Sequence, residues 1–323
     1  MIIAVPDDYH GVVPSLECFS LLDGHDVRVF RDVAPAFETM VANLRGADII
    51  VPIRERTRFS SKLLEALPGL KMISQTGRST HHVDLETCTR RGIAVAAGTH
   101  TSPYTVAEQT WALILAALRH IPEEAELMKR GGWRNALSLG LRGRTLGVFG
   151  LGKIGSLVAA TGASFGMRVL VWGREKSRAA AVTAGYAVAE NQRELFRDSD
   201  VLALMIRLTP DTRGIVTADD LAAMKAESLL VNTARAELIA PGVLERALEQ
   251  RRPGFAAVDV YENEPVIGGD HPLLRLPNTL CTAHSAWLEQ ETYELYFGEA
   301  FQNAAAFAAG RPAALVNPDV LKR

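Results

Sequence analysis

Cysteine is scarce in this sequence, and three thiols in 323 residues exclude a scaffold built on disulfides. Cys18, Cys88 and Cys281 lie far apart and show no spacing that is typical of a zinc site. We therefore predict reduced thiols, no metal centre and a cytoplasmic protein.

An excess of either charge is also lacking, because the sequence has 35 lysines and arginines and 37 aspartates and glutamates. No basic cluster is long enough to follow a phosphate backbone, so nucleic acid is not an expected partner. The longest apolar run, residues 106–118, contains Glu108 and Gln109 and falls short of the ~20 residues of a membrane span. Residues 1–10 carry no basic leader, so we expect neither a signal peptide nor a membrane partner.

Short apolar strands alternate with helical stretches along the chain, a pattern typical of parallel α/β sheets. A first group of strands is predicted at residues 2–5, 27–30, 48–51, 72–74 and 94–96. A second group is predicted at residues 146–149, 169–172, 201–205, 228–231, 255–260 and 279–282. The helix predicted at 105–118 is apolar on nearly all sides, so we expect it between domains or at a dimer interface. Another long helix is predicted at 290–309, and the chain length favours two domains.

The segment 146–174, LGVFGLGKIGSLVAATGASFGMRVLVWGR, reads as strand, tight turn, helix and strand. In such a unit Gly150 permits the turn, Gly152 lets the backbone approach a pyrophosphate, and Gly155 lets the helix pack closely on the strand. Free N–H groups at the start of the helix then face the phosphates. The motif predicts a dinucleotide site, and a glycine-rich turn without a ligand is the plain alternative.

The end of the second strand in this unit departs from the usual NAD pattern, which places a carboxylate there to hold the ribose 2′-hydroxyl. This chain has Gly173 followed by Arg174, with Lys176 and Arg178 close by. A guanidinium pairs with a phosphate through two hydrogen bonds, so the segment favours NADP(H) over NAD(H). A solvated basic loop is the alternative.

Arginines also follow two strands of the first group. Arg54 lies within the segment 52–56, and Arg78 follows Gly77 within the segment 75–80. Ligands of open α/β sheets bind at the carboxyl ends of the strands, and a guanidinium there suits an anionic substrate. Gly77 adds a place where backbone N–H groups can turn towards an anion. For each arginine alone, a surface ion pair is the alternative.

Three polar stretches follow strands of the second group, at residues 232–235, 259–265 and 282–285. In a doubly wound sheet they converge on the crevice that the glycine loop also faces. Arg235 would hold a substrate carboxylate with two hydrogen bonds and polarise the adjacent carbonyl. His284 would supply or remove the proton, since an imidazole changes protonation near neutral pH, and Glu264 would hold its ring. Each residue alone has an ordinary structural explanation, so this prediction of a hydride-transfer site depends on their convergence.

At these residues the sequence resembles the D-isomer-specific 2-hydroxyacid dehydrogenases along nearly its whole length. VFGLGKIG, NTAR, DVYENEP and TAHSA occur in the family's order, TVAEQTWALILAALRHIP resembles its interdomain helix, and RGIAVAAGT resembles the crossing segment before it. The resemblance implies an α/β fold of two doubly wound parallel-sheet domains. A Rossmann cofactor domain (residues 101–286) would be inserted into a flavodoxin-like substrate domain (residues 1–100 and 287–323). It also implies a homodimer built mainly on the cofactor domain.

The family's motifs imply roles for single residues. Arg235 would be the clamp for the substrate carboxylate and carbonyl, Glu264 the partner of the histidine, and His284 the general acid/base. Asp259 would take the nicotinamide carboxamide. The glycine motif and the resemblance together assign these residues to the cofactor: Gly150, Gly152, Lys153, Ile154, Gly155, Arg174, Thr209, Thr233, Ala234 and Asp259. The substrate contacts are assigned to Arg54, Gly77, Arg78 and Arg235. The implied reaction reduces a small anionic 2-oxo acid to a D-2-hydroxy acid.

Two segments depart from the family's usual pattern. Its substrate loop resembles G-x-G-x-D-N-x-D, whereas residues 77–84 read GRSTHHVD, which removes the second glycine and adds the positive charge of Arg78. Gly173 with Arg174 resembles the NADPH-using glyoxylate and hydroxypyruvate reductases.

Other functions stay open at this point. Residues 54–57 resemble the phosphate-contacting segment of D-3-phosphoglycerate dehydrogenases, although we expect no regulatory domain after residues 317–318. Formate dehydrogenases pair their histidine with glutamine, so Glu264 argues against that activity. Transcriptional corepressors share the scaffold and sense the cofactor, but the intact Arg235 and His284 favour turnover. The sequence does not identify the 2-oxo acid.

Overall fold

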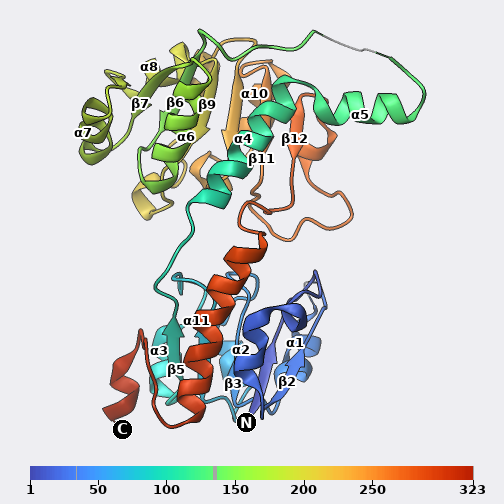
Figure 1. Cartoon of the computed structure of the whole chain (residues 1–323), viewed down its shortest axis with the longest axis vertical. Helices are drawn as coiled ribbons and strands as arrows, with labels where there is room; N and C mark the ends of the chain where they lie inside the picture. Colours follow the sequence, from blue (N-terminus) through green and yellow to red (C-terminus); the bar gives the residue numbers. More distant parts are fainter. Residues whose placement is uncertain (34, 134–136, 323) are drawn as a thin grey trace. The chain divides into compact units, whose positions relative to one another are not determined.

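The computed structural model describes residues 1–33, 35–133 and 137–322, which form two compact units (Figure 1). Unit 1 comprises Met1–Ser102 and Leu288–Arg323, and unit 2 comprises Pro103–Trp287. The chain therefore leaves unit 1 once, builds unit 2 without interruption and then returns.

The described residues of unit 1 form a five-stranded parallel sheet in the order β2-β1-β3-β4-β5. Its strands are β1 (Ile2–Val5), β2 (Asp26–Val29), β3 (Ile49–Ile50), β4 (Met72–Gln75) and β5 (Ala94–Ala97). The strand order reverses between β1 and β3. In doubly wound sheets ligands bind beyond the carboxyl ends of the strands at such a reversal.

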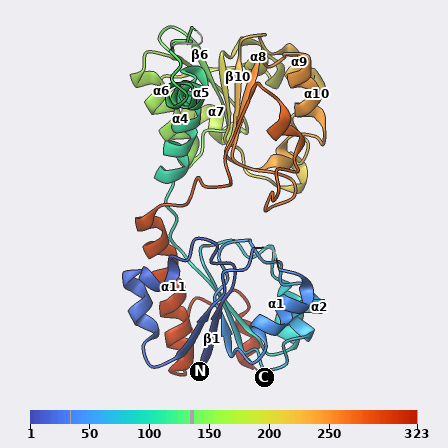
Figure 2. The same ribbon diagram turned by 90° about the vertical axis from the view of Figure 1, so that its right-hand side faces the viewer.

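Helices cover both faces of this sheet (Figure 2). One face carries α1 (Phe37–Leu44), α2 (Ser61–Glu65) and α3 (Leu85–Arg90), and the other carries α11 (Gln290–Ala308) with the 3-10 helix η2 (Glu17–Leu22). Two further 3-10 helices are η1 (Val13–Ser15) and η6 (Pro318–Lys322). Ser60, the N-cap of α2, accepts a hydrogen bond from the N–H of Leu63, which satisfies one of the free donors at the start of this helix.

The described residues of unit 2 form a seven-stranded parallel sheet in the order β12-β11-β10-β9-β6-β7-β8. Its strands are β6 (Thr145–Phe149), β7 (Arg168–Trp172), β8 (Ala187–Val188), β9 (Val201–Leu204), β10 (Leu229–Asn232), β11 (Phe255–Val258) and β12 (Thr279–Cys281). The strand order reverses between β6 and β9, so the carboxyl ends of these two strands mark the expected ligand crevice.

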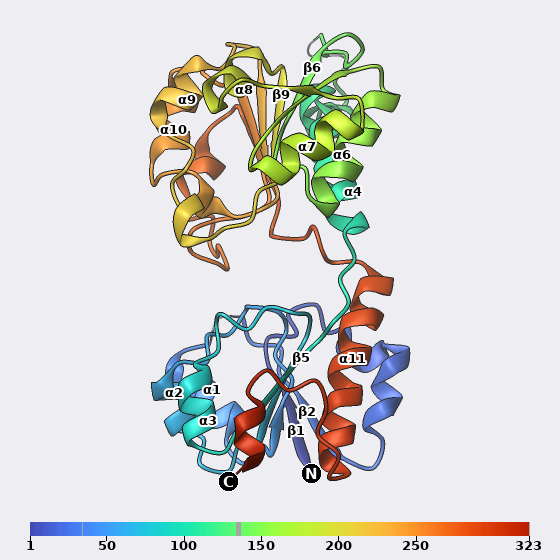
Figure 3. The same ribbon diagram turned by 90° about the vertical axis from the view of Figure 1, so that its left-hand side faces the viewer.

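Figure 3 shows α4, α6 and α7 on one face of this sheet and α8, α9 and α10 on the other. The α-helices are α4 (Tyr104–Leu118), α5 (Ile121–Lys129), α6 (Lys153–Ser164), α7 (Glu175–Thr183), α8 (Gln192–Asp198), α9 (Ala218–Ala223) and α10 (Val243–Glu249). The 3-10 helices are η3 (Pro210–Thr212), η4 (Ala236–Leu238) and η5 (Pro272–Arg275). Leu229 and Val231 belong to the apolar core of one face and Leu230 to that of the other, which explains why such strands read as unbroken apolar runs.

The predicted fold class is confirmed, and the predicted strands and long helices occur within a few residues of their expected bounds. The predicted helix at 105–118 corresponds to α4, which packs against α6, β10 and β11 within unit 2. The helix α5 was not predicted, and none of its residues is buried. Within the described part of the chain, no helix combines the length and apolar content needed to cross a membrane.

Candidate active site

The glycine loop after β6 contains three glycines that are needed for different reasons. Gly150 has a φ of 101°, and a Cβ there would lie 3.0 Å from the carbonyl oxygen of Met205. A Cβ on Gly155 would collide with the carbonyl oxygen of Gly150, so this glycine allows α6 to pack on the loop. A Cβ on Gly152 would meet no atom within 4 Å. The open side of the loop is therefore at Gly152, where the backbone can approach a phosphate.

The start of α6 offers backbone donors to that open side. Gly152 is the N-cap and supplies no side chain to the free N–H groups of the first turn, in which Lys153 and Ile154 lie. Such N–H groups bind phosphates, and Lys153 is exposed beside them.

The basic segment after β7 lies against the glycine loop. Gly173 has a φ of 154°, and a Cβ there would lie 3.2 Å from the Cβ of Ser177 and 3.4 Å from the Cα of Gly150. The position therefore has no room for an unstrained carboxylate side chain. Arg174 is exposed next to it, and the guanidinium of Arg178 lies 4.9 Å from the ring centroid of Trp172. The edge of the loop thus presents positive charge.

The turn after β10 carries Arg235, whose side chain is half-buried. The Nη1 of Arg235 donates to the carbonyl oxygen of Ala234 at 2.7 Å. Thr233 is buried, and its hydroxyl lies 2.7 Å from the hydroxyl of Thr110 in α4. Thr209 is the N-cap of η3, in the segment that follows β9, and forms a capping box with Thr212.

A short polar contact of the site joins His284 to Glu264. The Nδ1 of His284 lies 2.5 Å from the Oε2 of Glu264, and the two side chains are 29% and 31% exposed. The other carboxylate oxygen accepts the N–H of Tyr261 at 2.9 Å. Because an ionised carboxylate only accepts hydrogen bonds, Nδ1 carries a proton and Nε2 is the nitrogen left to exchange one. Burial raises the pKa of Tyr261, whose hydroxyl donates to the carbonyl oxygen of Thr282 beneath the histidine.

Asp259 is fully buried and holds the turn that presents the histidine. Its Oδ1 accepts the N–H of Ser285 at 2.9 Å and the hydroxyl of Thr282 at 2.5 Å, and its Oδ2 accepts the N–H of Ala286 at 2.9 Å. His284 itself has a φ of 49°, in the left-handed region that L-residues rarely adopt. These hydrogen bonds therefore fix a strained turn, a role for Asp259 that the sequence did not reveal.

The structure brings the predicted catalytic residues to adjacent strands. Arg235 follows β10, Glu264 follows β11 and His284 follows β12, and these three parallel strands are neighbours. The helix α4 also reaches this edge, because Gln109 lies 3.4 Å from the hydroxyls of Thr282 and Ser285. The sequence analysis missed the contributions of Gln109 and Thr110, since the apolar character of α4 hid its polar positions.

The predicted substrate residues of unit 1 divide into two groups. A Cβ on Gly77 would collide with the Nη1 of Arg54, so the guanidinium lies directly on this glycine, whose φ is 84°. The guanidinium also lies 5.1 Å from the ring centroid of Tyr296, and its Nε is 3.8 Å from the carboxylate of Glu55. Arg78 is exposed. Arg54 and Gly77 are thus brought together, whereas Arg78 extends into solvent.

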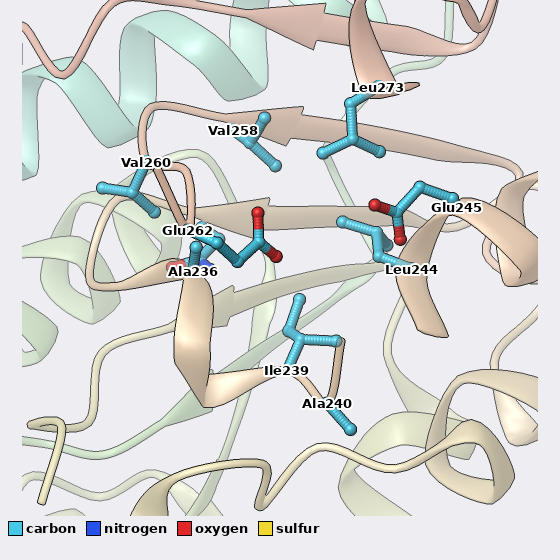
Figure 4. A pocket seen from close by; sticks show the side chains of 10 residues that line it. Ala236, Ile239, Ala240, Leu244, Glu245, Val258, Val260, Glu262 and Leu273 are labelled. Atoms are coloured by element: carbon cyan, nitrogen blue, oxygen red, sulfur yellow. The ribbon is translucent and has the colours of Figure 1, made fainter. Parts of the chain in front are cut away.

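A small cavity lies in unit 2 beside the Arg235 turn, with a volume of about 10 Å³ (Figure 4). Its lining residues include Asn232, Ala236, Ile239, Val260 and Glu262. This volume is close to the minimum for one water molecule. The cavity is therefore too small for a substrate or a cofactor.

A larger cavity of about 450 Å³ lies in unit 1, between the loop after β1 and the start of α11. It is lined by His10, Val12, Ser15, Leu16, Leu288, Glu289, Gln290 and Tyr293. None of the predicted substrate residues lines it.

The chain is similar to proteins of known family. Residues 111–286 match the model of the NAD binding domain of the D-isomer specific 2-hydroxyacid dehydrogenase family. A glyoxylate reductase of Aeropyrum pernix is 35% identical over 309 residues, which cover 92% of this chain and 91% of the relative.

Solved structures are similar over the whole length. An oxidoreductase from Ralstonia solanacearum is 46% identical with a TM-score of 0.95, covering 99% of this chain and 98% of that one. A phosphoglycerate oxidoreductase from Vibrio cholerae O395 is 47% identical with a TM-score of 0.93, covering 96% and 99% of the two chains.

Proposed function

This chain belongs to the D-isomer-specific 2-hydroxyacid dehydrogenase family and is an oxidoreductase that uses a nicotinamide cofactor, and we propose that it reduces a small 2-oxo acid with NADPH. The predicted family is confirmed. The observation that supports this reaction best is the 2.5 Å contact between His284 and Glu264. These residues follow β12 and β11, and Arg235 follows the next strand of the sheet, β10.

The proposed mechanism gives each of these side chains one task. Arg235 binds the substrate carboxylate through its planar fork of N–H donors and polarises the neighbouring carbonyl. Protonated His284 gives the proton on Nε2 to the carbonyl oxygen, while Glu264 holds the opposite side of the ring. The nicotinamide supplies the hydride when it is bound. In the reverse direction His284 takes the proton from the hydroxyl.

The glycine loop fits a dinucleotide, because the backbone at Gly152 is open on the side where a Cβ would meet nothing within 4 Å. We assign the pyrophosphate to the N–H groups of Lys153, Ile154 and Gly155. Thr209, Thr233, Ala234 and Asp259 keep their assignment to the cofactor as part of the same proposal. Unit 2 would thus be the cofactor domain and unit 1 the substrate domain.

The preference for NADP(H) rests on the segment after β7. A side chain at Gly173 would be strained, since its φ is 154° and a Cβ would lie 3.2 Å from the Cβ of Ser177, and Arg174 provides a guanidinium for a 2′-phosphate. We expect Arg174→Ser to weaken the NADPH affinity about tenfold while the NADH affinity changes little. The matched control is Arg193→Ser, which removes another exposed arginine of unit 2. An equal loss for both cofactors would remove Arg174 from the phosphate site.

The substrate of this proposal is a small 2-oxo acid such as glyoxylate or hydroxypyruvate. The relative from Aeropyrum pernix named glyoxylate reductase supports this choice. A second candidate is the phosphorylated 2-oxo acid of a D-3-phosphoglycerate dehydrogenase. It is supported by the relative from Vibrio cholerae and by Arg54, whose guanidinium is held over Gly77. We propose that Arg54, Gly77 and Arg78 contact the substrate in either case.

The test is a panel of initial rates with glyoxylate, hydroxypyruvate and phosphohydroxypyruvate, each with NADPH and with NADH. Selective NADPH oxidation with a small 2-oxo acid is the expected result. A preference for phosphohydroxypyruvate would promote the second candidate. No turnover together with tight cofactor binding would contradict both and favour a cofactor-sensing protein of the corepressor type.

We also propose a cytoplasmic homodimer without nucleic-acid or membrane partners, in which α5 and its surroundings contact a second copy. Four apolar side chains here are strongly exposed: Ile121 (54%), Met128 (52%), Trp133 (75%) and Leu137 (94%). We propose that these side chains are covered in the dimer, since large exposed apolar surfaces often mark interaction sites. Light scattering should find a dimer that Met128→Glu weakens, whereas Val182→Glu on α7, which replaces a side chain that is 70% exposed, should leave it intact.

A further inference from the structure

The side chain of Asn232 closes the turn that carries Arg235. Asn232 is the last residue of β10 and is 2% exposed. Its Oδ1 accepts the N–H of Ala234 at 3.0 Å, and its Nδ2 donates to the carbonyl oxygen of Arg235 at 2.9 Å. This orientation of the amide is the one that satisfies both partners, because only its oxygen can accept and only its nitrogen can donate.

We propose that Asn232 is a positioning residue that fixes Arg235 for the substrate carboxylate, an inference that rests on the function proposed above. Asn232 is paired with Leu204 of β9 and with Val258 of β11, so its backbone shares the rigidity of the sheet. Arg235 lies outside the sheet with extended backbone angles, φ −152° and ψ 140°. The amide of Asn232 thus connects the sheet to Arg235, which lies beyond the end of β10.

The precision that Arg235 needs makes this connection important for the reaction. A guanidinium binds a carboxylate through two parallel hydrogen bonds, which require a defined direction as well as a distance. Misplacement of a reacting group by about 1 Å can cost about 100-fold in rate. Asn232 itself is 2% exposed and lines the cavity of about 10 Å³, which is too small for a substrate, so we infer that it acts through Arg235.

Asn232→Asp is the sharpest single test, because aspartate has nearly the same shape. The carboxylate keeps an acceptor for the N–H of Ala234 and places a second acceptor against the carbonyl oxygen of Arg235, where a donor is needed. We expect kcat/KM for the 2-oxo acid to fall about 100-fold, mainly through KM, while the dissociation constant of the cofactor stays unchanged. Asn232→Ser, whose single hydroxyl cannot replace both groups of the amide at once, provides the same test if the aspartate variant does not fold.

Asn317→Asp is the matched control, because it replaces a buried asparagine that makes the same two kinds of hydrogen bond, but to backbone groups of unit 1. Asn317 is 7% exposed, accepts the N–H of Val95 at 2.8 Å and donates to the carbonyl oxygen of Ile93 at 2.9 Å, all within unit 1. Its variant should lower the unfolding temperature without raising the substrate KM. If both variants change KM equally, Asn232 has only a structural role.

A double-mutant cycle with Arg235 gives the final decision. If Asn232 acts through Arg235, then Asn232→Ala should reduce kcat/KM in the wild-type background and have no further effect in the Arg235→Ala background. Equal losses in the two backgrounds would overturn the inference while leaving the proposed function standing. The proposed function has a separate test with the wild-type protein. If this protein neither turns over the 2-oxo acid panel nor binds oxamate, a 2-oxo acid analogue, then both the proposed function and the inference are wrong.

Discussion

The two units each hold a histidine near the carboxyl edge of a parallel sheet, and these histidines differ in exposure and in hydrogen-bond partner. His284 in unit 2 contacts the carboxylate of Glu264 at 2.5 Å, and its side chain is 29% exposed. His82 in unit 1 is 6% exposed, and its Nε2 contacts the amide oxygen of Gln75 at 3.2 Å. No hydrogen-bond partner of its Nδ1 is found in the described part of the chain.

The partner and the exposure decide what each ring can do. The carboxylate of Glu264 holds one side of the accessible ring of His284, which orients that ring for the proposed proton transfer. Burial lowers the pKa of His82 to about 4, and the nearby Glu55 only partly opposes this effect. His82 therefore stays neutral at pH 7 and serves as a packed polar residue, whereas His284 is suited to exchange protons.

The largest expected effect comes from removing the proton-exchanging ring. His284→Gln should reduce turnover about 1,000-fold, because glutamine keeps hydrogen-bonding groups but cannot act as a general acid or base at neutral pH. The cofactor affinity should stay near that of the wild type, since the glycine loop is not altered. Steady-state rates and fluorescence titration with the cofactor measure the two quantities.

A second histidine of unit 2 supplies the control for that experiment. His271 contacts Glu262 at 3.1 Å and its side chain is 10% exposed, so it forms a second histidine–carboxylate pair in unit 2, to which the proposed mechanism gives no task. His271→Gln should lower stability and leave turnover close to that of the wild type. Equal loss of turnover in the two variants would show that any histidine–carboxylate pair of this unit matters only for folding.

In unit 2, the placement of the candidate catalytic residues was predictable from the sequence. Apolar strands followed by polar residues placed Arg235, Glu264 and His284 beyond the ends of three strands, and the sheet makes those strands neighbours. Strand order in a doubly wound sheet follows general rules of chain connection, so this part of the prediction needed no side-chain detail.

Other features depended on geometry that the sequence does not encode locally. The bonds of Asn232 and Asp259 to their turns involve individual backbone N–H and C=O groups, whose directions follow from the turn conformation. The contact of Arg54 with Gly77 joins loops 23 positions apart in the sequence. The assigned roles of Arg78, Arg174 and the other binding residues stay predictions.

The second expected effect concerns His82 and acid stability. Its pKa in the folded protein, about 4, lies below the ordinary value of 6.5, so the unfolded chain binds the proton at the higher pH. The contribution of neutral His82 to the free energy of unfolding is therefore fully present above pH 6.5 and is lost as the pH falls towards 4. The loss is on the order of 3 kcal/mol. Urea titrations at several pH values should show this slope in the wild type.

His82→Gln should flatten that slope, because glutamine keeps a polar contact with Gln75 and does not titrate. The matched control is His81→Gln, which removes the neighbouring exposed histidine and should retain the slope. If His82→Gln keeps the full acid sensitivity, then other groups control the acid stability and His82 is not the neutral counterpart of His284.

The smallest expected effects separate folding from binding within the glycine loop. Gly155→Ala places a Cβ against the carbonyl oxygen of Gly150 and 3.3 Å from the Cβ of Met205, so it should destabilise unit 2 by about 2 kcal/mol. Gly152→Ala meets no atom within 4 Å, so its unfolding temperature should match that of the wild type. Because its Cβ enters the space where a pyrophosphate approaches, cofactor affinity should fall about tenfold. Scanning calorimetry without cofactor and a cofactor titration measure the two effects. If Gly152→Ala binds the cofactor normally, the open side of the loop is not the binding side, and the assignment of unit 2 to the cofactor would need another surface.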